Sequence, residues 1–196
     1  MTERKVDGDP MRLELVTPTL DHLPGFVDAL KRDWSPDNTR HDEAIRHHLG
    51  LIERDPVRFV ADQDDPDARG GDITLPDGTR APRLPGFHLW IWDGEFCGTV
   101  GARWQPGTTD LPPHCLGHVG YAVVPWKRRR GYATLALRLV LPRLRTVGLP
   151  FVDLTTNADN LPSQRVILDN GGRLIAPFVK PDAYGGGDGL LFRIDL

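Results

Sequence analysis

A run of basic and small residues, 127–134, is the part of the sequence best suited to bind phosphate groups. It reads Lys-Arg-Arg-Arg-Gly-Tyr-Ala-Thr, follows an apolar segment ending at Pro125, and opens a stretch with apolar residues at helical spacing. The first turn of a helix leaves backbone N–H groups unpaired and carries partial positive charge. Gly131 and Ala133 allow a diphosphate close to the backbone, and arginines and the Thr134 hydroxyl can donate to its oxygens. The run predicts a phosphate site at a helix N-terminus.

Two other interpretations of this basic run stay open. Lys127 to Arg130 can form a solvated surface patch, or it can contact nucleic acid. A nucleic-acid partner is disfavoured by the formal net charge of -3 and by the lack of interleaved aromatic residues beyond Trp126 and Tyr132. The surrounding strand–loop–helix pattern favours the phosphate interpretation over the solvated patch.

A second polar group follows the apolar segment at 151–155. Asn157, Asn160 and Ser163 lead into an expected helix that stops at Gly171-Gly172, since glycine supplies the left-handed residue after many helices. Asn160 suits a helix cap, a ligand, or both. Ser163 suits a structural role in the first helical turn as well as a chemical one.

These segments resemble the GNAT superfamily of N-acetyltransferases. Arg128-x-x-Gly131-x-Ala133 fits the pattern Arg/Gln-x-x-Gly-x-Gly/Ala, and the Asn160 helix lies at the distance that the family predicts. The resemblance covers about residues 88–178 and looks closest to a bacterial group of predicted acetyltransferases without an assigned substrate. It implies an α/β fold with a central mixed sheet flanked by helices, and acetyl-CoA as acyl donor. The cofactor residues that it implies are Val123, Val124, Arg128, Arg129, Arg130, Gly131, Tyr132, Ala133, Thr134, Asn157, Asn160 and Ser163.

The resemblance also implies direct attack of a primary amine on the thioester in a ternary complex. The strand before the basic loop separates from its neighbour near Val123–Val124, so that the pantetheine arm can pair with it. The Val124 N–H is then expected to stabilise the carbonyl oxygen as it gains charge. His118 stands where many relatives have a glutamate and is expected to be the general base, with Glu95 and His114 as weaker candidates and a purely structural His118 as the alternative.

The family's usual proton donor to the leaving thiolate is replaced in this sequence. Alignment through Asn160 and Gly171 puts Ile167 at the position of a tyrosine, and an isoleucine has no proton to give. Ser163 lies four residues earlier, on the same helical face, and is the expected substitute. A chain that binds acyl-CoA without catalysis, as a sensor or interaction module, is therefore the alternative function.

The elements that must position these residues follow from hydrophobic periodicity and turn signals. Strands are expected at 12–16, 58–61, 88–92, 96–104, 116–124, 151–155, 173–178 and 190–195, and helices at 20–34, 39–53, 131–147 and 161–170. Thr19 is the expected cap of the first helix, and Pro142 is expected to loosen the third. Residues 62–85 form a loop insertion with a small hairpin around Pro76-Asp77-Gly78, which suits a substrate lid or a surface ornament.

Composition limits the remaining possibilities. The 196 residues, with 26% charged and 39% hydrophobic, predict one globular domain over 1–196 with a flexible tail at 1–10. The sequence shows no apolar stretch of membrane-spanning length and no signal-peptide pattern, so a cytoplasmic location is expected. Cys97 and Cys115 match neither a disulfide framework nor a metal site, and no metal is expected. The acceptor amine and the acyl chain length stay open, a homodimer is implied by resemblance alone, and the substrate-pocket candidates are Trp34, Trp90, Trp92, Trp104 and Tyr184.

Overall fold

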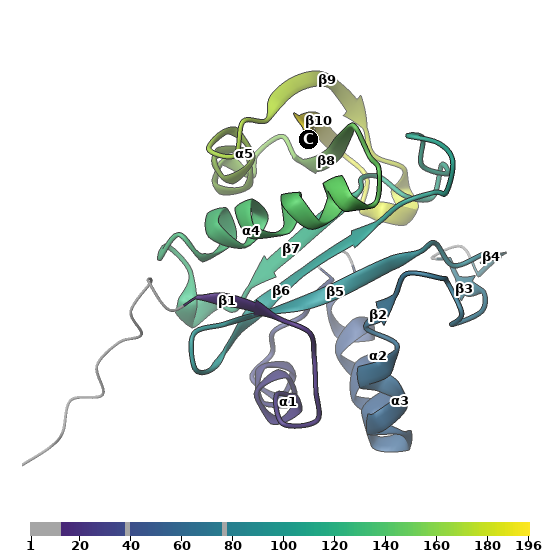
Figure 1. The fold of residues 1–196 in the computed structure, drawn as a ribbon, viewed down its shortest axis with the longest axis vertical. Coiled ribbons are helices and arrows are strands. Elements are labelled where there is room, and N and C mark those ends of the chain that lie inside the picture. The colour runs from purple at the N-terminus through teal and green to yellow at the C-terminus, as the bar shows by residue number, and fades with distance from the viewer. Residues whose placement is uncertain (1–12, 38–39, 76–77) are drawn as a thin grey trace, which may run out of the picture.

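A computed structural model of the chain describes residues 13–37, 40–75 and 78–196. Two sheets form its frame (Figure 1). The first has the order β1-β5-β6-β7 with β2 paired to β5, and the second has the order β8-β10-β9. Each recorded strand pair is antiparallel. The strand bounds are β1 Glu14–Val16, β2 Asp64–Asp65, β3 Ile73–Thr74, β4 Arg80–Ala81, β5 Gly86–Trp92, β6 Phe96–Arg103, β7 Val119–Val123, β8 Phe151–Asn157, β9 Arg173–Val179 and β10 Asp188–Asp195.

Helices cover both faces of the first sheet (Figure 1). The helices between β1 and β2 lie on one face, and α4 lies on the other, between the first sheet and the second. The bounds are α1 Leu23–Lys31, α2 His41–Arg54, α3 Pro56–Ala61, α4 Tyr132–Thr146 and α5 Leu161–Leu168, with short 3-10 turns η2 Pro125–Lys127 and η3 Asp182–Tyr184. No helix in the described part of the chain is long and apolar enough to cross a membrane.

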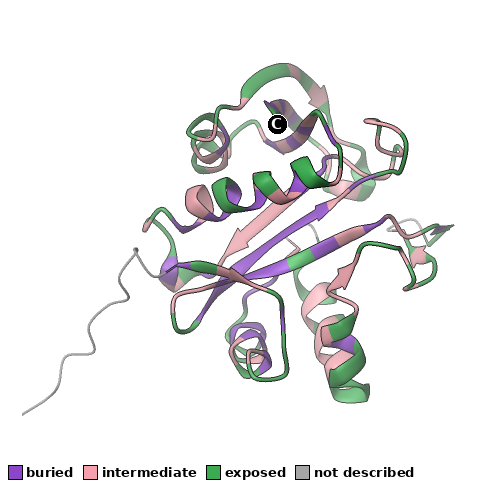
Figure 2. Cartoon of the chain, viewed as in Figure 1, coloured by how far each residue is buried: buried purple, intermediate pink, exposed green. Residues whose placement is uncertain are grey.

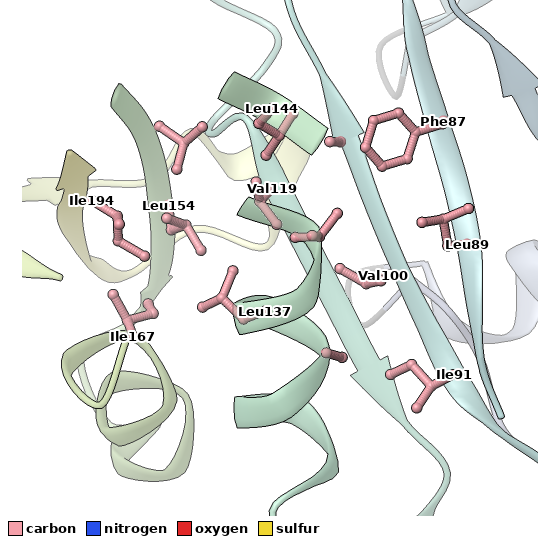
Figure 3. Packing of buried hydrophobic residues seen from close by; sticks show 14 of the residues in the cluster. Phe87, Leu89, Ile91, Val100, Val119, Leu137, Leu144, Leu154, Ile167 and Ile194 are labelled. Carbon is pink, nitrogen blue, oxygen red and sulfur yellow. The ribbon is translucent and has the colours of Figure 1, made fainter. Parts of the chain in front are cut away.

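Strand alternation divides the apolar side chains of the first sheet between two cores. Phe87, Leu89 and Ile91 point toward α4, and Figure 3 shows them facing Leu137, with Leu154 of the second sheet beyond it. The neighbouring β5 residues, Trp90 and Trp92, point to α1 and α2 and help to form the second core. Figure 2 shows the consequence, since β6 is buried along most of its length between the two helical layers.

The two sheets separate at one point that matters for the site. The His118 N–H donates to the Asp153 oxygen at 2.7 Å, and the Asp153 N–H donates to His118 Nδ1 at 3.0 Å. Beyond this link β7 and β8 belong to different sheets. We call the region between β7 and β8 beyond the His118–Asp153 link the wedge. The edge of β7 that is turned away from β6 borders this wedge.

The expected strands and helices occur in the expected order, except at 58–61 and for the additional short strand β2. Residues 58–61 were predicted as a strand, and they belong to helix α3. Asp55 explains the difference, because its Oδ1 accepts from the Arg58 N–H at 2.9 Å, and Pro56 occupies the first turn. The helix expected to begin at residue 39, which lies outside the described residues, is seen from His41, and α4 continues past Pro142.

The remaining local expectations have mixed outcomes. Thr19 contacts the Nδ1 of His22 at 2.9 Å, and His22 holds the cap position of α1. The flanks of the predicted hairpin in the 62–85 insertion pair as β3 and β4, whereas its turn at 76–77 and the tail at 1–10 lie outside the described residues. The same insertion contributes β2, which pairs with β5, so it is joined to the first sheet.

Candidate active site

The basic run forms a tight loop that ends at an uncapped helix. Arg129 and Gly131 have left-handed φ values of 62° and 76°, and Gly131 is the cap residue of α4. No side chain of the described residues caps this helix. The first N–H groups of this 15-residue helix therefore have no side-chain acceptor among the described residues. This geometry suits an anion, as the sequence predicted.

One buried carboxylate holds both ends of this loop. Asp93, in the turn between β5 and β6, accepts from Lys127 Nζ at 2.9 Å and from the Tyr132 hydroxyl at 2.7 Å. Its side chain is 1% exposed, and that of Lys127 is 10% exposed. Burial alone would raise the pKa of Asp93, but hydrogen bonds from Lys127 and Tyr132 hold this pKa below its usual value. Residues 128–131 are thus fixed between two anchored side chains.

The three arginines differ in position. Arg128 is exposed, and its Nε donates to the Val123 oxygen at 3.1 Å, which places its guanidinium at the end of β7. Arg129 is exposed and Arg130 is half-buried. Ala133 and Thr134 lie half-buried in the first turn of α4. The loop therefore brings cationic side chains and free helix N–H groups to one place.

Two of the predicted cofactor residues already have partners within the protein. Tyr132 is buried and its hydroxyl is bound to Asp93, so only its backbone remains for a ligand. Val124 is fully buried in the second core, and its N–H donates to the Cys97 oxygen at 3.0 Å. The expected oxyanion donor is therefore already occupied. Since N–H groups alternate between the two edges of a strand, the groups that face the wedge belong to Val123 and Tyr121.

The second polar group lies at the start of α5. Asn160 caps this helix, because its Oδ1 accepts from the Ser163 N–H at 3.1 Å. Asn157 ends β8, and its Oδ1 accepts from Lys180 Nζ at 2.7 Å. Ile167 is 1% exposed in the core between α4 and α5 (Figure 3). The position of the family's usual tyrosine is therefore filled by a packing residue.

A tyrosine from another element places a second hydroxyl beside Ser163. Tyr121 of β7 reaches α5, where its hydroxyl lies 2.8 Å from Ser163 Oγ and donates to the Ser163 carbonyl at 3.2 Å. Burial raises the pKa of Tyr121 to about 12, so it keeps its proton near neutral pH. Sequence reasoning missed this residue. The available signal was its place two residues before Val123, on the same face of the strand.

His118 lies where β7 and β8 part, 1% exposed. Because a backbone N–H can only donate, the bond from Asp153 fixes Nδ1 as the acceptor and leaves the proton of the neutral ring on Nε2. Burial, opposed by the Asp153 carboxylate, lowers the pKa of His118. His118 is thus neutral near pH 7, and its lone pair becomes available only when the bond from Asp153 is released.

The predicted substrate-pocket tryptophans lie mostly in the cores. Trp34 and Trp90 are buried in the second core, where Trp90 stacks on Phe26 at 4.9 Å between ring centroids, and Trp92 packs against the same core. Trp104 is buried in the first core. Tyr184 is half-buried in η3. None of these tryptophans therefore defines an acceptor site, and the structure does not bring the five aromatic candidates together.

Comparisons with solved structures show the fold. A putative GnaT-family acetyltransferase from Bordetella pertussis matches with a TM-score of 0.61 and 19% identity, over 97% of this chain and 99% of that one. The microcin C7 self-immunity acetyltransferase MccE, solved with acetyl-CoA and AMP, matches with a TM-score of 0.59 and 13% identity, over 94% and 93%. Mycobacterium smegmatis RimJ, solved with a CoA-disulfide, matches with a TM-score of 0.59 and 20% identity, over 93% and 81%.

The family assignment rests on the sequence match. No curated protein sequence matches the chain, whereas the model of the Acetyltransferase (GNAT) family matches residues 24–171. This range includes the basic loop, the wedge and all of α5. The expected GNAT fold is confirmed as well, built from helices and antiparallel sheets. The chain therefore belongs to the GNAT family of acetyltransferases, which use acetyl-CoA as acyl donor.

Proposed function

We propose that this enzyme acetylates a primary amine, which attacks acetyl-CoA directly while both are bound in the wedge. The observation that carries the proposal is the alignment of three features along β7. The uncapped start of α4 lies at one end of this strand, unpaired N–H groups lie along its edge, and the Tyr121–Ser163 hydroxyl pair lies beside it. These features can hold a diphosphate, a pantetheine arm and a thioester in that order.

Each part of the cofactor has a matching group in this arrangement. The diphosphate would bind the first N–H groups of α4 together with Arg128 and Arg129. The pantetheine arm would pair with the β7 edge, where the N–H groups of Tyr121 and Val123 face the wedge. One of these N–H groups would also donate to the thioester oxygen, which becomes negatively charged when the amine adds.

The reaction requires two proton transfers, and the hydroxyl pair suits the second. The amine nitrogen forms a bond to the thioester carbon, and the carbon–sulfur bond then breaks, with its electron pair leaving on sulfur. Tyr121, hydrogen-bonded to Ser163, would pass a proton to this thiolate through the serine or directly. This proposal keeps the predicted role of Ser163 and adds Tyr121 as its partner.

His118 stays the predicted base for the first proton transfer. If it accepts the proton of the attacking ammonium group, kcat should rise with pH through the lowered pKa of His118, so that the rising limb lies below pH 6.5. His118→Gln cannot accept a proton near neutral pH and should lose this limb, with kcat reduced about 10²-fold or more. A pH profile of kcat for both proteins checks this. An unchanged limb in His118→Gln would assign the base elsewhere.

Cofactor affinity gives the primary test of the proposed function. Calorimetric titration with acetyl-CoA is expected to show a single site that Arg128→Ala/Arg129→Ala weakens about 10-fold to 100-fold, since bonds to charged groups contribute roughly 1.5–3 kcal/mol. Arg138→Ala, an exposed residue of α4, is the matched control and should leave the affinity unchanged. Release of free CoA with a panel of primary amines then measures transfer. Tight binding without transfer to any amine would favour the alternative, a non-catalytic acyl-CoA module.

A further inference from the structure

The sheet face opposite α4 contains two glycines that lie directly across from each other. Gly101 of β6 pairs with Gly120 of β7, and His88 of β5 pairs with Gly101 on the other side. All three residues share the face to which Trp90 also points, because directly paired residues of antiparallel strands lie on the same face. Beyond Trp90, this face therefore has no side chain of its own at Gly101 and Gly120.

Two side chains from neighbouring positions, those of His88 and Arg103, lie over these glycines. A Cβ at Gly101 would clash with the ring of His88, so this ring lies over Gly101. A Cβ at Gly120 would lie 3.5 Å from Arg103 Nη2, so the guanidinium lies beside Gly120. The side chain of Arg103 thus extends from β6 over β7, toward the edge that borders the wedge. Glycine at these two positions provides the space for both side chains.

Arg103 has no carboxylate partner among the described residues. Its recorded side-chain partner is Cys115 Sγ at 3.8 Å, a weak acceptor. Asp153 is linked to His118 at this end of β7, and its two carboxylate oxygens accept from Arg193 at 2.7 and 2.8 Å. By contrast, Lys127 and Arg143 each have a carboxylate within 3 Å. A half-buried guanidinium without an anion, next to the reacting region, is the unexplained feature of this face.

We propose that Arg103 binds a carboxylate carried by the acceptor close to its reactive amine. This inference rests on the proposed function and names its substrate class: an amino acid, or a peptide with an acidic residue near its N-terminus. The carboxylate would take the bidentate geometry that suits a guanidinium, and the exposed ring of His88 would lie beside it. Held there over Gly120, the acceptor would have its amine near the β7 edge, where the thioester is proposed to lie.

Pairs of acceptors that differ in one carboxylate test whether the enzyme recognises this charge, and whether it belongs to a free amino acid or to a peptide. Alanine is compared with alaninamide, and the peptide amide Ala-Glu-Ala-Ala with Ala-Gln-Ala-Ala, by the rate of CoA release. The wild-type enzyme should favour the carboxylate member of at least one pair by tenfold or more in kcat/KM, and the pair concerned tells a free amino acid from an acidic peptide. Arg103→Ala should abolish this preference through KM for the acceptor, without a change in KM for acetyl-CoA. Arg103→Lys should retain part of it.

A binding measurement keeps this inference separate from the proposed function. Two pairs of acetylated products are titrated into the CoA-loaded enzyme. The first pair is N-acetylalanine and N-acetylalaninamide, and the second is N-acetylated Ala-Glu-Ala-Ala amide and N-acetylated Ala-Gln-Ala-Ala amide. Carboxylate-dependent binding that Arg103→Ala removes and Arg138→Ala leaves intact would support the inference even if no amine is acetylated, in which case the proposed function alone fails. Equal binding within both pairs, or an equal loss for both members in Arg103→Ala, would overturn it.

Discussion

Asp93→Ala is expected to destabilise the protein by about 3–5 kcal/mol, the usual cost of breaking a buried ion pair, because Lys127 Nζ then keeps the largely exposed Glu95 carboxylate, at 3.3 Å, in place of a buried partner. The substitution removes the acceptor of Lys127 Nζ and of the Tyr132 hydroxyl, both of which are buried. For a chain of this size, thermal unfolding should shift downward by roughly 10 °C. Guanidinium unfolding monitored by fluorescence measures the change in free energy of unfolding directly.

Two comparisons make this prediction specific. Asp169→Ala breaks the exposed pair with Arg165 and should cost no more than about 1 kcal/mol. Asp93→Leu/Lys127→Met replaces both charges by apolar groups and should recover much of the stability, while the cofactor loop loses its anchor. An Asp93→Ala cost as small as that of Asp169→Ala would show that the buried pair contributes little.

The same carboxylate links stability to pH. Its pKa in the folded protein lies below the usual 3.8. A group with a depressed pKa stabilises the fold above its unfolded pKa, and this contribution is lost as the pH falls through the folded value. The contribution of Asp93 is therefore complete above about pH 5 and declines below pH 3.8. The wild-type free energy of unfolding should fall more steeply with acid than that of Asp93→Leu/Lys127→Met.

Tyr121→Phe and Ser163→Ala are expected to lower kcat by about 10²-fold each, the lower range for loss of a positioned proton donor. Each variant interrupts the hydroxyl pair while leaving the packing of the ring or the helix cap in place. Because the two hydroxyls act as one unit, the double variant should be only slightly slower than either single variant. Steady-state rates of CoA release, with KM for acetyl-CoA measured separately, provide the test.

A lower kcat in these variants can come from a destabilised fold or from the loss of proton transfer, and two measurements distinguish these causes. Thermal unfolding and acetyl-CoA affinity should stay close to wild type for both, and Tyr121 should add no falling limb to the pH profile below about pH 12. Additive effects in the double variant would mean that the two residues act independently. An unchanged kcat in Tyr121→Phe would leave Ser163 without the proposed relay.

Most of the fold could be predicted because its local signals agree with its packing. The Asp93-Gly94 turn, the apolar strand before Asn157 and the glycines after α5 each mark a boundary that the structure keeps. The 58–61 segment was misassigned, since a short apolar run fits a strand or a helix equally well. The cap signal at Asp55-Pro56 would have decided the question.

Only those parts of the site that are formed by consecutive residues could be predicted from the sequence. The phosphate loop depends on consecutive residues, so its position at the start of α4 could be expected from the sequence. Tyr121, Asp93 and Arg103 act on partners that are between 12 and 42 residues away in sequence, and a single sequence does not show such pairs. The occupied Val124 N–H likewise follows from strand register, which periodicity alone does not give.

Because β7 and β8 separate, a cofactor bound between them is expected to add to the free energy of unfolding. An open strand edge is a template for pairing with another chain, and in the proposed complex the pantetheine arm occupies that edge. Ligand at 100 times its dissociation constant adds about 2.7 kcal/mol to the free energy of unfolding. In this proposed complex acetyl-CoA stabilises the folded enzyme, and we expect the cofactor-free form to aggregate more readily.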